Sequence, residues 1–431
     1  MTKNFKFLGF IFLLSSFTMC KQKETKTDFE FELKKEPTIF FKSFVDCNMA
    51  EVWIGDTFRI FPGKYGEDPL WGYSNELKYA SGKNAEEVFN KKYEEFKEPT
   101  MPLNVKPNAE GLHGAVWFET VYQDKKDFSG KTLYALYHNE NYPLTLPFIS
   151  KTGKGYIDKN WPQGLTGAMT PAAVCRIGIM KSTNGGLSWE NKGIVLEDNQ
   201  ERMTLKPHNN SVTFAGGVGD PSAVASGDYL YIFYGEYGYP GTYDPQNFNA
   251  EKEQEGQCIS MARIKLSDLD NPTGKANRYD GQAYKANYDG IGKPIRNIQI
   301  SKSNGGGPIS DSISKYYWGP SVSWNHYLKA WVMLMAKSEG ASWNGTSIYI
   351  SFNTHPVLEE NNSQDWTTPK LILSKPGHTI WYPSLQPIGD DIATKLKYTS
   401  LQLGEQARLF YKDQTKDTAV YTSEYSIKFK K

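Results

Sequence analysis

The sequence predicts an all-β protein folded as a five-bladed β-propeller, and three observations support this prediction. From about residue 38 onward, short apolar runs alternate with Gly, Pro, Asn and Asp, and amphipathic helix patterns are scarce. A Pro-Ser pair followed by an apolar residue recurs along the chain. Each copy precedes two hydrophobic runs with the length and alternation of strands. A repeated unit of several short strands is typical of a propeller blade.

The Pro-Ser repeat defines the blades of the second half of the chain. Its copies are GDPSAV at 219–224, WGPSVS at 318–323 and WYPSLQ at 381–386. Two further units without the pair are predicted at residues 115–182 and 43–61. A two-sheet sandwich is the alternative fold, but it would not explain why one motif opens successive units. The segment at 84–97, NAEEVFNKKYEEFK, is expected to be a helix inserted between strands.

The N-terminus has the layout of a secretory signal. Two lysines precede an apolar run from Phe7 to Leu14, which is too short to span a bilayer permanently. The cysteine that follows resembles a bacterial lipoprotein signal, which implies a lipid on Cys20. We therefore expect a signal peptide at 1–20, a flexible tether at 21–37 and one catalytic propeller domain at 38–431, anchored in the bacterial envelope (outer membrane or periplasm). The alternative is an ordinary signal peptide cleaved nearby.

Composition narrows the class of ligand. The chain has 49 basic and 48 acidic side chains, and this balance argues against nucleic acid as a partner. Aromatic residues make up 14% of the chain, with 27 Tyr and 11 Trp, which suits both strands and stacking on sugars. The cysteines Cys47, Cys175 and Cys258 show no metal-ligand spacing and are expected to be buried, without disulfides. We expect a monomer without a cofactor, although a structural calcium ion would leave no trace in this sequence.

A short polar stretch, KSTNGGLSWE at 181–190, predicts a tight turn after the third strand of its unit. Asn184 can hydrogen-bond its own turn, and the glycines permit positive φ. The stretch resembles the Asp-box of sialidase-like propellers, with Asn184 and Ser188 where the usual form has Asp and Thr. That resemblance implies a turn on the outer rim that takes no part in chemistry.

The innermost strands of a propeller converge at one end of its axis, so their first residues are the candidates for a functional site. One residue holds a comparable place in each predicted blade: Asp46, Glu119, Asp220, Trp318 and Trp381. The first three are carboxylates, and like charges brought together shift one another's pKa. We therefore expect an acidic funnel that binds a carbohydrate.

The stretch GDPSAVASGDYLYIFYG, an Asp-Pro followed by an aromatic-rich strand pair, resembles the inner strands of five-bladed propeller glycoside hydrolases of the arabinanase, β-xylosidase and invertase-like groups. The resemblance implies essential carboxylates on early blades and favours inversion. Such chemistry needs one protonated and one ionised carboxyl across the glycosidic bond, which points to Glu119 and Asp220. A third carboxyl can tune the acid. The structural alternatives are a turn cap at Asp220 and a packing role for Glu119.

Further candidates surround this pair. In YHNE at 137–140, His138 and Glu140 share one face of a strand, and Glu140 is the third catalytic candidate. A hydrogen-bonded pair at a blade edge is the alternative for these two residues. The predicted substrate-binding residues are Asp46, His113, His138, Glu236, Trp318, Trp381 and Tyr382.

Three other functions remain open from the sequence. A sialidase would need three arginines to clamp a carboxylate, and the chain offers Arg59, Arg176, Arg263 and Arg408 in strands. Its TFRIFP stretch resembles the sialidase Phe-Arg-Ile-Pro motif, but Phe61 interrupts it. A polysaccharide lyase could use Tyr137 or His138 as its base. A glycan-binding surface lipoprotein would need the aromatic residues and not the acids.

Overall fold

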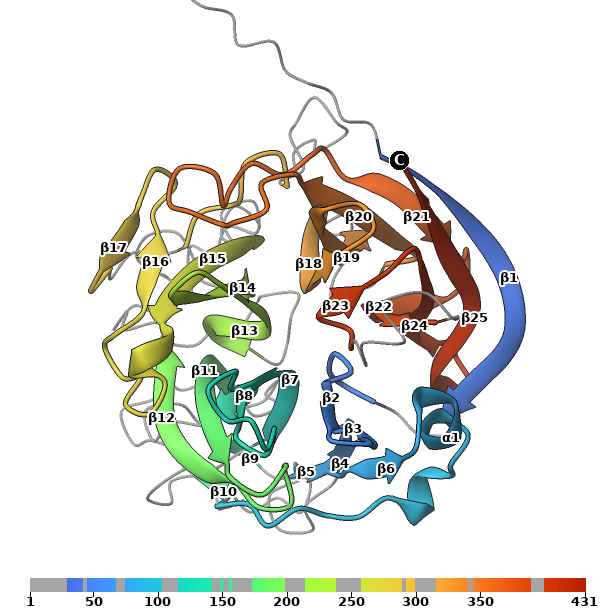
Figure 1. Cartoon of the computed structure of the whole chain (residues 1–431), viewed down its shortest axis with the longest axis horizontal. Helices are drawn as coiled ribbons and strands as arrows, with labels where there is room; N and C mark the ends of the chain where they lie inside the picture. The colour runs from blue at the N-terminus through green and yellow to red at the C-terminus, as the bar shows by residue number, and fades with distance from the viewer. Residues whose placement is uncertain are drawn as a thin grey trace, which may run out of the picture.

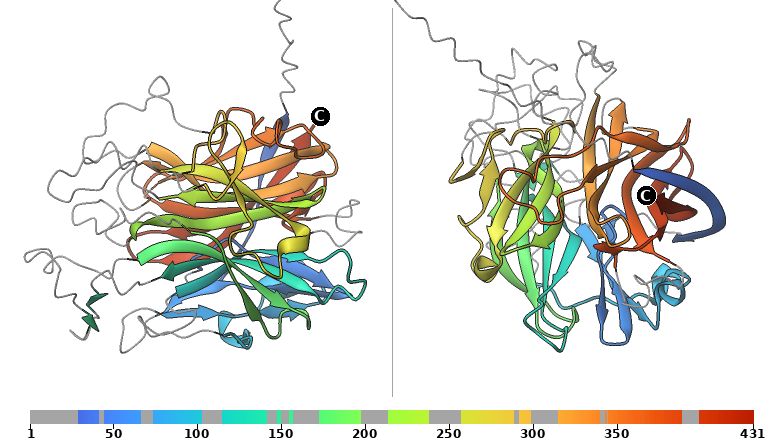
Figure 2. Two further views of the ribbon diagram at one scale, coloured as in Figure 1. Left: turned by 90° about the vertical axis from the view of Figure 1, so that its left-hand side faces the viewer. Right: turned by 45° about the horizontal axis from the view of Figure 1, so that its top comes forward.

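The computed structural model describes residues 29–41, 45–66, 74–102, 115–141, 148–149, 155–156, 173–197, 214–237, 257–288, 292–298, 315–339, 343, 345–388 and 399–431. The strands form blades around a central axis, with β2, β7, β13, β18 and β22 on the inner side (Figure 1). The second and third blades are joined into one sheet by a short parallel pairing of β11 with β13. Viewed from the side, the strands of all the blades run between the same two faces of the molecule (Figure 2). The predicted five-bladed propeller is therefore confirmed.

Most strands of each blade are antiparallel and follow chain order; β1 in the fifth blade and β23 in the fourth are the exceptions. The first blade contains β2 (Glu51–Ile54), β3 (Thr57–Ile60) and β6 (Ala80–Gly82), with the hairpin β4 (Gly63–Gly66) and β5 (Ser74–Leu77). The second contains β7 (Ala115–Gln123), β8 (Leu133–Asn141), β11 (Ala173–Ser182) and β12 (Glu190–Leu196). The third contains β13 (Phe214–Ser226), β14 (Tyr229–Glu236), β15 (Cys258–Lys265), β16 (Asn277–Tyr279) and β17 (Tyr284–Ala286).

The fourth blade contains β18 (Lys315–Asn325), β19 (Ala330–Glu339), β20 (Ser347–Asn353) and β21 (Lys370–Ser374), with β23 (Gln402–Leu403) added beside β18. The fifth contains β22 (Thr379–Pro387), β24 (Gln406–Gln414), β25 (Ala419–Lys430) and β1 (Glu30–Phe41). A separate two-stranded ribbon is formed by β9 (Phe148–Ile149) and β10 (Gly155–Tyr156). Large apolar side chains fill the core, and many of them are fully buried.

The ring closes through the two ends of the chain. Strand β1 lies outermost in the fifth blade and pairs with β25 from Glu30 opposite Lys430 to Phe41 opposite Tyr421 (Figure 1). The predicted tether at 21–37 is therefore wrong over residues 30–37, which belong to the fold. The prediction failed because Glu30–Pro37 carries many charged residues, and an outermost strand needs only one face buried.

The Pro-Ser repeat marks a β-bulge in the inner strand of the third, fourth and fifth blades. Two residues interrupt the register in each: Asp220–Pro221, Gly319–Pro320 and Tyr382–Pro383. Glu119 interrupts β7 in the same way. The residue before each proline has positive φ, at 47° for Asp220, 58° for Gly319 and 50° for Tyr382. Bulges redirect side chains, and non-glycine residues with positive φ are strained, a combination common at functional sites.

The predicted helix at 84–97 is shorter than expected. Only α1 (Ala85–Phe89) and a 3₁₀ turn (Tyr93–Glu95) form, and the extended Lys92 separates them. The four apolar side chains of the segment, Val88, Phe89, Tyr93 and Phe96, are nevertheless buried together. Packing against the first blade therefore decides the backbone here, because so short a helix is unstable alone. No helix among the described residues is long and apolar enough to cross a membrane.

The turn at 182–189 is held by its own side chains. Asn184 Oδ1 accepts hydrogen bonds from the N–H groups of Leu187 at 3.1 Å and Ser188 at 3.0 Å. Ser182 Oγ accepts one from Gly186 N–H at 2.8 Å, and Gly186 has φ 87°. Ser182 lies opposite Leu133 on β8, whereas His138 lies further along β8, toward its other end. The turn therefore lies at the end of β8 and β11 that points away from His138.

Candidate active site

The convergence of the inner strands brings three chemically active side chains together. Glu119 on β7, His138 on β8 and Asp220 on β13 each place one ligand atom within 4.8 Å of the other two. All three side chains are buried, and Glu119 and Asp220 retain only 3% and 4% exposure. The bulges explain this meeting, because they insert Glu119 and Asp220 into otherwise apolar strands at the same level of the propeller.

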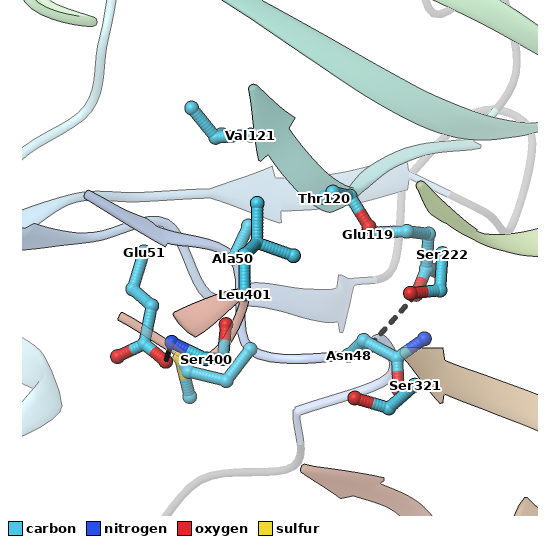
Figure 3. A pocket seen from close by; sticks show the side chains of 11 residues that line it. Asn48, Ala50, Glu51, Glu119, Thr120, Val121, Ser222, Ser321, Ser400 and Leu401 are labelled. Atoms are coloured by element: carbon cyan, nitrogen blue, oxygen red, sulfur yellow. Dashed lines mark hydrogen bonds between the residues drawn. The ribbon is translucent and has the colours of Figure 1, made fainter. Parts of the chain in front are cut away.

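Glu119 is placed to hold a proton. Its Oε2 accepts a hydrogen bond of 2.7 Å from the backbone N–H of Asn48 in the first blade (Figure 3). Burial raises the pKa of Glu119 well above its usual range, and the negative charge of Asp220 raises it further. Glu119 also borders a cavity of about 10 Å³ between the inner strands, lined in part by Thr120, Ser222 and Ser321 (Figure 3). That space holds about one water molecule.

Asp220 is held by two partners. His138 Nδ1 lies 3.2 Å from Asp220 Oδ1, and the Tyr237 hydroxyl donates a hydrogen bond to Oδ2. Burial lowers the pKa of His138, but the hydrogen bond and the charge of Asp220 outweigh burial, so the pKa is raised overall. The backbone N–H of Asp220 also donates a 3.2 Å hydrogen bond to His138 Nδ1. Asp220 and Glu119 therefore occupy different environments, which is the pattern of an acid and its tuning charge.

Asp46 completes the acidic group from the first blade. It lies just before β2, and its side chain keeps 20% exposure. Its Oδ1 is 3.3 Å from the buried Lys412 Nζ of β24. The charge of Asp46 contributes to the raised pKa of both Glu119 and His138, so it reaches the same site. Among Asp46, Glu119 and Asp220, Asp46 is the most open to a ligand.

Glu119 and Asp220 approach each other more closely than the acid and base of an inverting enzyme do. Inverting glycosidases keep roughly 6.5–9.5 Å between two carboxyl groups to leave room for a water molecule. Carboxylate oxygens of Glu119 and Asp220 instead approach within 4.8 Å. This pair therefore does not have the spacing of an inverting acid and base.

The two other predicted acids have different surroundings. Glu140 is buried on the same strand as His138, and its charge helps to raise the pKa of His138. Glu236 is fully buried. Its Oε2 lies 2.7 Å from a guanidinium nitrogen of Arg278 and accepts a hydrogen bond from Gly292 N–H at 2.8 Å. Glu236 thus belongs to an ion pair inside the third blade, and its parallel with His138 and Glu140 is only one of sequence position.

An aromatic wall stands on the other side of the site. The ring centroids of Trp318 lie 5.5 Å from those of both Trp381 and Tyr382. Trp343, which the sequence interpretation missed, joins them by accepting a 2.9 Å hydrogen bond from Trp381 Nε1 at its carbonyl. Burial and the charges of Asp220 and Asp46 raise the pKa of Tyr382 well above its usual range. The wall therefore borders the acids.

Three other residues of the site were also missed. Tyr237 follows the FYGE run, and its aromatic character could have suggested a site residue. Asn48 contributes its backbone N–H, which no side-chain pattern reveals. Lys412 is a charged residue inside the apolar run ARLFYKD, and a charge within an apolar strand could have marked it as a site residue. The predicted residues His113 and Cys20 lie outside the described residues.

The strand arginines do not form a carboxylate clamp. Each has its own polar partner away from the acids: Arg59 with Ser81, Arg176 with Asn139, Arg263 with Glu360 and Arg408 with Ser423. A sialidase-type site built from these four residues is therefore not supported. A cation could instead contact Glu119, His138 and Asp220 together, since their ligand atoms are within 4.8 Å of one another.

These features define a five-bladed propeller with a buried acidic site at the meeting point of its inner strands. No protein-family model matches the chain, and no curated protein matches its sequence. Solved structures do resemble it in arrangement. An N-acetylgalactosamine deacetylase from F. plautii, in complex with blood group B trisaccharide, is 11% identical, with 92% of this chain and 95% of that chain covered and a TM-score of 0.45.

Two glycoside hydrolases show a similar likeness. An α-L-arabinofuranosidase from Lactobacillus brevis is 10% identical, with 91% of each chain covered and a TM-score of 0.45. An exo-1,5-α-L-arabinanase from a bovine ruminal metagenomic library is 10% identical, with 90% of this chain and 94% of that chain covered and a TM-score of 0.42. The likeness concerns the arrangement of the strands, and the chemistry of this chain must be argued from its own residues.

Proposed function

We propose that this protein hydrolyses a glycosidic bond in an oligo- or polysaccharide. The observation that carries the proposal is the meeting of Glu119 and Asp220, two buried carboxyls from different blades, beside an aromatic wall. Burying two such groups together is costly, so the arrangement requires a compensating role. A general acid beside a carboxylate that tunes its pKa is the arrangement that acid–base cleavage of a sugar bond uses, and aromatic faces suit the apolar sides of sugars.

The roles follow from the environments. Glu119 is the general acid, because burial and the charge of Asp220 raise its pKa and keep its proton in place near neutral pH. Asp220, held by His138 and Tyr237, is the charge that tunes Glu119. Asp46, the most exposed of these three carboxylates, is the base or nucleophile on the other side of the bond.

The test is a panel of purified oligosaccharides and polysaccharides with product analysis, followed by amide variants on the substrate cleaved. Glu119→Gln, Asp220→Asn and Asp46→Asn are each expected to lower kcat by about 10²–10⁴-fold while the fold remains intact. Glu190→Gln, at a side chain with 72% exposure, is the matched control. If Glu119→Gln and Asp220→Asn both keep wild-type turnover, the proposal fails. If no substrate is cleaved and the variants still bind glycan, the protein is a binding module.

A metal-assisted hydrolysis is the second candidate, favoured by the approach of Glu119, His138 and Asp220 within 4.8 Å. Chelation separates the two candidates. Under the acid–base proposal, activity survives prolonged treatment with EDTA and gel filtration. If activity is lost and then restored by a divalent cation, Glu119 and Asp220 act as ligands instead.

A further inference from the structure

A buried cation lies directly behind Asp46. Lys412 on β24 has a side chain with 0% exposure, and its Nζ lies 3.3 Å from Asp46 Oδ1. The same Nζ stands 3.8 Å from the ring centroid of Trp381, which is the cross-strand neighbour of Lys412 on β22. The contact joins the fifth blade to the first across 366 residues of sequence.

The burial of Lys412 limits what it can do. A side chain without exposed surface cannot contact a substrate in the funnel, so its effect passes through neighbours such as Asp46 and Trp381. An ammonium in such a place is costly unless it is paired. Burial lowers the pKa of Lys412 to about 8, and the charge of Asp46 offsets part of that decrease. The pairing with Asp46 therefore favours the protonated form of Lys412.

The groups around Asp46 explain why a cation is needed there. Glu119 on β7 and Asp220 on β13 bring further carboxyls to the same site, and Asp46 raises the pKa of Glu119. His138 on β8 is drawn toward Asp220 at 3.2 Å. Lys412 approaches Asp46 from the neighbouring fifth blade and gives it a positive partner of its own.

We propose that Lys412 is a positioning residue that fixes the orientation of the Asp46 carboxylate, with Trp381 as the platform for its ammonium. This inference rests on the proposed function, in which Asp46 is the base or nucleophile. The inference adds that the role of Asp46 depends on Lys412, which does not contact the substrate.

Two variants test the proposal against a matched control. Lys412→Met keeps the length of the side chain and removes the charge, and it should lower kcat/KM roughly tenfold to a hundredfold in protein that is still folded by circular dichroism. Lys412→Arg keeps a charge that does not titrate, so it should recover part of the loss and extend activity above pH 8. Lys181→Met is the control, because Lys181 pairs with Asp270 at 2.8 Å and lies over Tyr134, away from the site.

A second measurement does not depend on turnover. The pKa of Lys412, followed by NMR of ¹³Cε-labelled lysine and assigned with Lys412→Met, should fall below its value of about 8 in Asp46→Asn. An unchanged pKa would overturn the inferred pair, as would wild-type kcat/KM and an unchanged pH profile in Lys412→Met. If the pKa falls but Asp46→Asn keeps full turnover, the pair is real and the role of Asp46 in the proposed function is wrong.

Discussion

The Nδ1 atom of His138 lies 3.2 Å from Oδ1 of Asp220, and this contact joins the second blade to the third beside Glu119. The side chains retain only 5% and 6% exposure, so the interaction is poorly screened by water. The charge of Asp220 raises the pKa of both Glu119 and His138, so this one carboxylate favours the protonated form of both neighbours.

The His138–Asp220 contact predicts a pH-dependent stability. The pKa of His138 is raised above its ordinary value of 6.5, so its contribution is present below that value and lost as pH rises through the folded pKa. His138→Asn keeps a donor for Asp220 but cannot be protonated. The advantage of the wild type over this variant should therefore be larger at low pH than at pH 9, as measured by thermal melts. His355→Asn, at a surface pair with Asp365, should show no such trend.

Glu51 is a second group whose contribution to stability should decrease as pH rises. Burial raises the pKa of this carboxyl to about 8, although Ser400 N–H donates a 2.8 Å hydrogen bond to it. Its contribution to stability is therefore present below its ordinary pKa and lost as pH rises through 8. Glu51→Gln should be more stable than the wild type at pH 9 by on the order of 5 kcal/mol, and nearly equal at pH 4.5. Chemical denaturation at both pH values tests this; a constant difference would contradict it.

The turn at 182–189 should contribute to stability and not to activity. Asn184→Ala removes the acceptor for two backbone N–H groups, those of Leu187 and Ser188. We expect a loss of about 1–2 kcal/mol in the free energy of unfolding, with kcat/KM unchanged. Asn361→Ala, at an exposed side chain, is the control for the loss of an amide. A large fall in kcat/KM for Asn184→Ala would mean that the turn is coupled to the site.

The anchor predicted at Cys20 is testable although Cys20 lies outside the described residues. In a bacterial host, Cys20→Ala should move the protein from the membrane fraction to the soluble fraction and abolish incorporation of a labelled fatty acid. Lys21→Ala should leave both properties unchanged. A Cys20→Ala variant that stays in the membrane fraction would point to another mode of attachment.

Local patterns were enough to predict the blades and the two central acids. Alternating apolar residues specify strands because one or both faces must be buried, and the Pro-Ser repeat signals a unit that recurs. Glu119 and Asp220 stood out for a physical reason: each is a charge inside an apolar strand, which folding tolerates only with compensation. The strands around them were therefore readable from the sequence itself.

Only the tertiary structure decided which distant residues meet. The pairing of Asp46 with Lys412 spans 366 residues, and the strand that closes the ring joins residues 30–41 to the last blade. Neither contact produces a periodic pattern in the sequence, because each depends on how the blades close around the axis. The approach of Glu119 and Asp220 within 4.8 Å depends likewise on bulges in two separate strands. The sequence thus determined the strands and the charges, and ring closure decided their distances, because contacts between blades are set by three-dimensional packing and not by local periodicity.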